Sequence, residues 1–256
     1  MKKYLEDVKL KYEGKVFKTN QFGDLIVLKY NNAEDVEVMF LDTKYTTSAR
    51  MQCIKHGRVR DFLKPFMFGV GFITKTVGSK DKNYSTWQRM LERCYETKCQ
   101  SKYPTYIGCT VSENFKYLEY FSKWCVNQIG FDSKDEKGRP FQLDKDILLK
   151  GNKVYSEDTC CFVPAEINSL FTKSNKSRGK YLIGVSYVKH LGKYVAYIRA
   201  YEKSNYLGVF STEAEAFYAY KQAKESRVKD LANKWKDEID PRAYNALMNY
   251  EVEMHD

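Results

Sequence analysis

Hydrophobic and polar positions alternate with a period of two over residues 193–201, and this alternation predicts a β-strand with two unlike faces. Tyr194, Ala196 and Ile198 share one of those faces. A shorter strand is predicted before the turn that precedes this one, and another over residues 206–210. We therefore expect a three-stranded sheet in the C-terminal third of the chain.

A long helix is predicted to follow the third strand. Thr212, with Glu215 three positions later, is typical of the capping box at a helix start. After it, Ala216, Ala219 and Tyr220 recur at helical spacing, and small alanines let a helix lie close to a sheet. The helix is therefore expected to cover the alanine-bearing face of the sheet and to leave the other face bare.

The net charge of the chain is concentrated on this segment. Residues 171–236 contain 14 Lys and Arg against 5 Asp and Glu, so they carry +9 of the formal +10 of the whole chain. Lys and Arg neutralise phosphates, and a ribbon of two or three strands fits the major groove of DNA. The bare face therefore predicts binding of double-stranded DNA, with a solvated polar face as the alternative.

The candidate DNA-binding residues fall into two groups. Residues 171–179 are polar and basic without periodicity, and they are expected to form a flexible linker whose cations follow the DNA backbone. The candidates in the linker are Lys173, Lys176 and Arg178, and those on the sheet are Ser186, Val188, Lys193, Tyr197, Arg199, Tyr201 and Tyr206.

The C-terminal segment reads RGKYLIGV, then GKYVAYIR, then YLGVFSTEAEAFYAY. Over about 55 residues it resembles the APETALA-type (ethylene-response-factor) DNA-binding domain. The resemblance implies three strands, a packed helix and a sheet that reads the major groove, and Arg199 matches a base-contacting arginine of that family. The sequence departs from the family at Ser186 and Val188, where the family has arginines, and at Tyr194 and Tyr206, where it has tryptophans.

Near the N-terminus, apolar segments at residues 15–20, 24–31 and 36–43 predict short strands separated by turns. They favour a small five-stranded barrel without helices. The second segment is apolar at nearly every position, as expected of a strand buried on both sides. The region resembles the small barrel that often precedes nuclease-like modules in phage proteins. Its basic side chains, which would either touch phosphate or form a solvated rim, are Arg50, Lys55, Arg58 and Arg60.

Between residues 80 and 170 the pattern predicts a third unit. A helix is expected over residues 84–95 and another over residues 116–130. Residues 141–171 then predict a strand, a turn, a second strand and a helical end, which is a ββα layout. The residues expected to face the core are Trp87, Met90, Leu91, Cys94, Phe115, Leu118, Phe121 (or Tyr120), Trp124 and Cys125.

This unit resembles phage HNH homing-endonuclease-like proteins, in which an APETALA-type domain commonly follows. The resemblance rests on the order WQRMLERCY, YPTYIGCTVSENF, FSKW and LDKDILLKGNKVYSEDTCCFVPAEIN, and with the C-terminal segment it covers about 170 residues. It implies a nuclease in which one divalent cation, here Mg²⁺, polarises a scissile phosphate while a histidine activates water.

The resemblance places Asp144 at the metal-binding aspartate and Lys145 at the general-base histidine. A lysine is protonated near neutral pH and cannot accept a proton, although it could steady a phosphate. Asp146 would bind metal or act as the base, and Asn152 and Asn168 are the candidate polar ligands. Three interpretations stay open: an active variant nuclease, a degenerate core that only binds DNA, and carboxylates that merely cap a turn.

Cysteine usage and hydropathy indicate the compartment. Seven cysteines without regular spacing predict buried, reduced thiols, and zinc is disfavoured because no CxxC pair is present. No apolar run is long enough to span a membrane, and the N-terminus lacks the apolar region of a secretion signal. We therefore expect a cytoplasmic protein, and the resemblance to phage HNH proteins implies a phage-infected bacterial host cell.

The expected fold class is α+β. The acidic tail is expected to form a short helix that packs back on the body, rather than a mimic of DNA charge. A protein partner is expected, if anywhere, at the barrel or the tail, and RNA binding is a third functional hypothesis. The predicted domains are a β-barrel-like domain (1–70), an HNH-like ββα unit (80–170), a basic linker (171–179), an APETALA-type domain (180–236) and the acidic tail (237–256).

Overall fold

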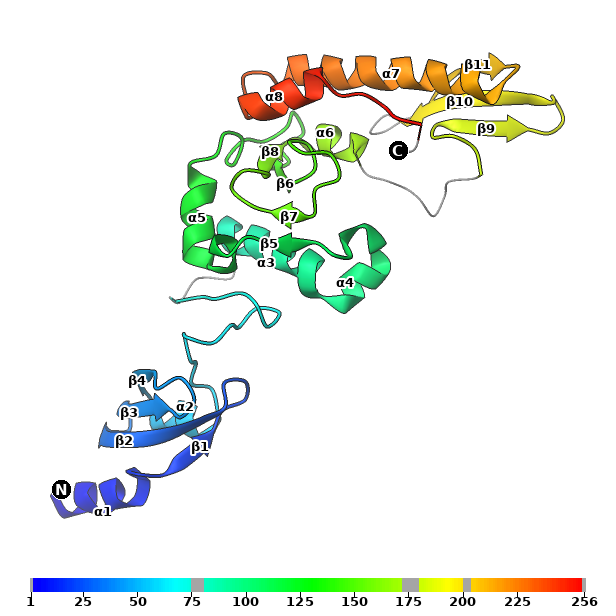
Figure 1. Ribbon diagram of the computed structural model, residues 1–256. Coiled ribbons are helices and arrows are strands. Elements are labelled where there is room, and N and C mark those ends of the chain that lie inside the picture. Colours follow the sequence, from blue (N-terminus) through cyan, green and yellow to red (C-terminus); the bar gives the residue numbers. More distant parts are fainter. Residues whose placement is uncertain (1, 75–80, 172–179, 200–203, 255–256) are drawn as a thin grey trace. The chain divides into compact units, whose positions relative to one another are not determined.

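The structure is a computed structural model that describes residues 2–74, 81–171, 180–199 and 204–254 (Figure 1). It is a mixed α+β protein with several small sheets, as the sequence predicted. No helix in the described part of the chain is long and apolar enough to cross a lipid bilayer. Contacts divide the chain into two units, one of residues 1–81 with 116–119 and one of residues 82–115 with 120–256.

The N-terminal unit is built on an open antiparallel sheet in the order β1-β2-β3-β4, so the predicted barrel was wrong. The expectation that this region contains no helix was also wrong, since Met51 and Ile54 are both buried in a short helix and their spacing of three belongs to a helix rather than a strand. The elements are α1 (Lys2–Tyr12), β1 (Val16–Lys18), β2 (Asp24–Asn32), β3 (Asp35–Phe40), β4 (Thr46–Ala49) and α2 (Met51–Lys55).

β2 buries only one of its faces. Leu25, Val27 and Tyr30 lie in the core, whereas Leu28 is 44% exposed. The register between β2 and β3 shifts twice, and such bulges let inward side chains depart from strict alternation. The prediction of a strand buried on both sides was therefore wrong, because the second face of an open sheet meets solvent.

The predicted basic edge of this unit is partly engaged in local contacts. Arg50 pairs with Glu34 at 2.8 Å, although both side chains are well exposed. The guanidinium of Arg60 lies 4.0 Å from the ring centroid of Phe66, and Lys55 lies over another aromatic ring. Arg50, Lys55 and Arg60 therefore make their contacts within their own unit.

The second unit begins with helices around buried aromatic side chains. α3 (Lys82–Tyr95) buries Trp87, Met90, Leu91 and Cys94, as predicted. The indole Nε1 of Trp87 donates to the carbonyl oxygen of Phe115 at 2.8 Å. The other elements here are α4 (Thr97–Lys102), η1 (Pro104–Tyr106), β5 (Thr110–Val111), η2 (Asn114–Lys116), α5 (Leu118–Val126) and β7 (Val154–Tyr155).

A ββα element lies in the middle of this unit. β6 (Gln142–Asp144) pairs antiparallel with β8 (Cys161–Val163), and α6 (Ala165–Leu170) follows directly. This is the predicted succession of strand, turn, strand and helical end. The long loop between β6 and β8 therefore carries most of the candidate catalytic residues.

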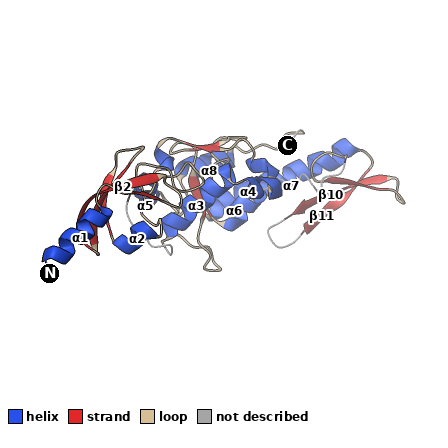
Figure 2. Ribbon diagram, turned by 90° about the horizontal axis from the view of Figure 1, so that it is seen from below, coloured by secondary structure: helices blue, strands red, loops and turns tan. Residues whose placement is uncertain are grey.

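The C-terminal sheet has three strands in the order β11-β10-β9. They are β9 (Val185–Val188), β10 (Lys193–Arg199) and β11 (Ser204–Phe210), and α7 (Glu213–Lys234) runs alongside them (Figures 1 and 2). Both hydrogen bonds of the capping box between Thr212 and Glu215 are formed. The three-stranded sheet, the start of α7 at the capping box and the burial of the alanine-bearing face agree with the sequence prediction.

The tail packs back on the body, as preferred from its helical spacing. α8 (Pro241–Met248) buries Ala243 and Leu247. Beyond it, Val252 joins the core between the C-terminal sheet and α7, and its backbone N–H donates to the Glu225 carboxylate at 2.9 Å. The tail is thus part of the fold of the second unit.

We expect Gly184→Ala to lower the free energy of unfolding by about 2–3 kcal/mol. Gly184 has a φ of +76°, and an added Cβ would lie 2.1 Å from Cδ2 of the buried Tyr220 ring. Gly192→Ala is the matched control, since φ is +62° there and the space is open. It should cost only about 1 kcal/mol. Urea denaturation of both variants measures the difference, and equal losses would contradict the steric argument.

Candidate functional site

The C-terminal sheet has one face that α7 does not cover. In β10, Ala196 and Ile198 are buried against the helix, whereas Tyr197 points the other way. The register places Val195 between Ser186 and Val209 on that second face. This second face is the surface for which the sequence predicted DNA binding.

Two tyrosines dominate the bare face. Tyr197 and Tyr206 are direct cross-strand partners, and their ring centroids lie 5.5 Å apart at an interplanar angle of 55°. They are 42% and 58% exposed. Two large amphipathic rings held in contact on a sheet surface are typical of binding surfaces, because each has an apolar body and a polar tip.

The other candidate DNA-binding residues are distributed as follows. Ser186 and Lys193 are exposed, and Val188, the cross-strand partner of Lys193, is half-buried. The backbone of Arg199 lies in β10 opposite Ser204. The remaining candidates lie outside the described residues: Lys173, Lys176, Arg178 and Tyr201.

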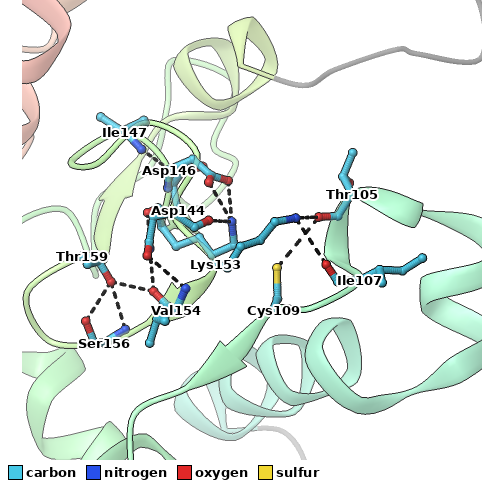
Figure 3. A network of polar contacts seen from close by, with 12 residues as sticks. Thr105, Ile107, Cys109, Asp144, Asp146, Ile147, Lys153, Val154, Ser156 and Thr159 are labelled. Carbon is cyan, nitrogen blue, oxygen red and sulfur yellow. Dashed lines mark hydrogen bonds and ion pairs between the residues drawn. The ribbon is translucent and has the colours of Figure 1, made fainter. Parts of the chain in front are cut away.

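In the central unit, Asp144 caps the turn after β6. Its Oδ1 accepts hydrogen bonds from the backbone N–H groups of Asp146 at 2.7 Å and Ile147 at 2.8 Å (Figure 3). The residue is only 9% exposed. Burial raises the pKa of the Asp144 carboxyl above its ordinary value, against the lowering effect of the two backbone donors.

Lys145 occupies the middle of the same loop with its ammonium group inside the protein. Its Nζ donates to both carboxylate oxygens of Asp146 and to the backbone carbonyl of Asn152, each at 2.7 Å. The residue is 4% exposed, whereas the side chain of Asp146 is 43% exposed. A buried ammonium with three acceptors holds the two ends of the loop together.

The two candidate asparagine ligands are engaged in different places. Asn152 Nδ2 donates to the carbonyls of Lys145 at 2.9 Å and Val154 at 2.6 Å, and its Oδ1 accepts from the backbone N–H of Val154. Asn168 Nδ2 donates to the side-chain oxygen of Gln142 at 2.6 Å. Asn152 and Asn168 therefore hydrogen-bond to different partners and do not form the predicted pair of metal ligands.

These residues do not fit a magnesium site. Mg²⁺ is usually bound by one or two carboxylates together with water and phosphate oxygens, but here the Asp146 carboxylate and the Asn152 carbonyl are already directed at an ammonium group. Among the described residues, no three His, Cys, Asp or Glu side chains are placed to hold a metal ion. A fixed positive charge within the loop also repels a divalent cation.

The seven cysteines are all free thiols. Most are buried, and burial raises the pKa of Cys94 to about 12. A thiol protonated at neutral pH is a poor nucleophile and a poor metal ligand. The predicted buried thiols are confirmed for Cys94, Cys109 and Cys125, and for the adjacent pair at residues 160–161.

The sequence prediction missed how the C-terminal sheet is tied to the ββα element. The indole Nε1 of Trp235 donates to the Glu166 carboxylate, and its ring meets Phe141 edge-on with centroids 5.4 Å apart. Lys224 of α7 is buried and donates to the Leu170 carbonyl at the end of α6. The single long helix therefore packs on the sheet at one end and on the central element at the other.

A second missed residue is Lys153, which is exposed and directly precedes β7. Its Nζ donates to the carbonyl oxygens of Thr105 at 2.7 Å and Ile107 at 3.3 Å (Figure 3). It joins the loop after β6 to the segment after α4. Hydrogen bonds between segments this far apart leave no signal in the local sequence pattern.

In comparisons with known proteins, no protein-family profile, no curated protein and no solved structure matches the chain.

Proposed function

We propose that this protein binds double-stranded DNA and that the bare face of its C-terminal sheet lies in the major groove. The observation that carries the proposal is the exposed Tyr197–Tyr206 pair, in which Tyr197 shares its strand with the exposed Lys193, on a sheet whose other face is covered by α7. The segment around it carries nearly all the excess positive charge of the chain. An uncovered sheet face within a basic segment suits a DNA groove in shape and in charge.

In this proposal the central ββα element is a platform without metal-dependent catalysis. The resemblance to HNH homing endonucleases supports its position on DNA, and the Lys145 contacts argue against cleavage. The candidate base Asp146 is paired with the ammonium, and the candidate metal ligand Asp144 caps a turn. Both carboxylates therefore make contacts that stabilise the loop.

The test uses the purified full chain on a pool of random duplexes, with EDTA or with Mg²⁺. Bound fragments are sequenced, and all strands are examined for new ends. We expect enrichment of a sequence motif that is the same in both conditions, with intact strands. New ends that form only with Mg²⁺ would establish the nuclease alternative, and the absence of any bound duplex would refute the proposal.

We expect Arg199→Ala to weaken discrimination between the selected duplex and a scrambled one by about 1–3 kcal/mol. Arg199 is the residue that matches a base-contacting arginine in the resemblance, and its backbone pairs with Ser204 of β11 at the end of β10. Competition binding of the two duplexes measures the change. Lys189→Ala, in the exposed turn between β9 and β10, is the control and should weaken both duplexes alike. Unchanged preference in Arg199→Ala would mean that another surface reads the sequence.

A further inference from the structure

The bare face of the C-terminal sheet is apolar at its centre. We call it the valine–tyrosine face, formed by Val188, Val195, Val209, Tyr197 and Tyr206. Val195 is 3% exposed, so its side chain is enclosed within the protein and lies between Ser186 and Val209 in the register. Val209 beside it is 42% exposed. The exposed apolar groups on this face are therefore the Val209 side chain and the two tyrosine rings, while the polar Ser186 lies beside Val195 on β9 and Lys193 lies opposite Val188.

This composition limits which base edges the face can contact favourably. In the major groove, guanine, cytosine and adenine present hydrogen-bond donors and acceptors, whereas thymine adds a C5-methyl group. Burying an unpaired polar edge against aliphatic side chains is unfavourable, and burying a methyl there is favourable. The exposed Val209, beside the tyrosine rings, is thus matched to the thymine methyl.

The dimensions of the sheet permit this contact. Three strands with two spacings of about 4.8 Å span roughly 10 Å, and the major groove is about 12 Å wide. Val195 and Val209 stand opposite each other in the row nearest the middle of the sheet. Tyr197 and Tyr206 form the next row, where their rings can lie against sugar or base methyl groups while the hydroxyl groups meet water or phosphate.

We propose that the valine–tyrosine face recognises thymine through its C5-methyl group, so that the preferred ligand is a duplex with thymines in the contacted major groove. The inference rests on the proposed function and names the chemistry of its specificity. It concerns apolar contact and is separate from the arginine-to-base hydrogen bond that the family resemblance implies.

The experiment compares one duplex in two chemical forms. The duplex selected from the random pool by the full chain is resynthesised with uracil in place of thymine, which removes the methyl groups and leaves every hydrogen-bonding group of the base. We expect affinity to fall about fourfold for each contacted methyl, which corresponds to about 0.8 kcal/mol.

Variants localise the effect. Val209→Ser, on an exposed position of β11, should bring the ratio of thymine to uracil affinities toward one. Tyr218→Ser is the matched control, since Tyr218 is 53% exposed on α7 rather than on the bare face, and its ratio should match the unmodified protein. Because each variant is judged by a ratio, partial loss of folded protein does not alter the comparison.

The outcomes separate this inference from the proposed function. Duplex binding with equal affinity for thymine and uracil would overturn the methyl inference and leave DNA binding intact. Binding to neither duplex would overturn both. Preference for single strands would overturn the inference in favour of base stacking on the two tyrosines.

Discussion

Replacement of Lys145 by alanine should lower the free energy of unfolding by about 3–4 kcal/mol, the largest effect we expect from a single substitution. The change removes three hydrogen bonds at 2.7 Å from a residue that is 4% exposed. It also leaves the Asn152 carbonyl without its ammonium donor and opens space where the lysine stem was packed. Because the Asp146 side chain is partly exposed, its carboxylate can bind water in the variant. The expected loss of stability therefore lies at the lower end of the range for a broken buried ion pair. Urea denaturation gives the value directly.

Two variants and a metal titration control this result. Lys145→Met keeps the volume of the side chain and should recover part of the loss, because only the polar contacts are missing. Lys98→Ala removes an exposed lysine of the same unit and should change stability by less than about 0.5 kcal/mol. The melting temperature of the unmodified protein should be the same in EDTA as in excess Mg²⁺. A Mg²⁺-dependent rise in melting temperature would show that the loop binds metal after all.

These expectations explain why the departure at Lys145 matters. In the resemblance this position belongs to the general base, and an ammonium group there cannot take a proton. The structure gives the ammonium a different task, since it joins Asp146 to the far end of the loop at Asn152. The resemblance places a bound metal ion at this loop. Here the ammonium group of Lys145 holds the loop together instead.

The helices could be predicted from the sequence because their signals are local. The apolar spacing of α3 and the capping box of α7 each lie within a few residues, and both were confirmed. The N-terminal barrel was predicted wrongly because closure depends on whether the first and last strands pair, and strand patterns do not specify pairing. Met51 and Ile54 indicated the short helix only by their spacing of three.

In the candidate site, too, features with a local sequence signal could be predicted, and contacts between distant segments could not. The alternation along β10 identified the covered face, since Ala196 and Ile198 are buried as expected. The side-chain partners of Lys145 depend on how a loop of several residues returns on itself, and no periodicity encodes that return. The contact of Trp235 with Glu166 is likewise a tertiary feature between residues 69 positions apart. Sequence reasoning therefore located the surfaces and did not supply the contacts that connect them.

The double variant Tyr197→Ala/Tyr206→Ala should weaken binding to the selected duplex by about 3 kcal/mol, or roughly a hundredfold. The two rings are in contact with each other and are 42% and 58% exposed, so a groove that covers the bare face must cover both. Their removal should affect folding little, since neither ring is buried in the core. Fluorescence anisotropy with a labelled duplex measures the affinity.

The matched phenylalanine variant decides which part of the tyrosines matters. Tyr197→Phe/Tyr206→Phe keeps both rings and removes only the hydroxyl groups, so it should retain most of the affinity if apolar contact dominates. Tyr218→Ala removes an exposed tyrosine from α7 and should bind as the unmodified protein does. If the phenylalanine variant loses as much affinity as the alanine variant, the hydroxyl groups carry the interaction, and the face reads polar base edges instead of methyl groups. If neither double variant changes affinity, DNA does not lie on the sheet, and the basic segment must bind it elsewhere.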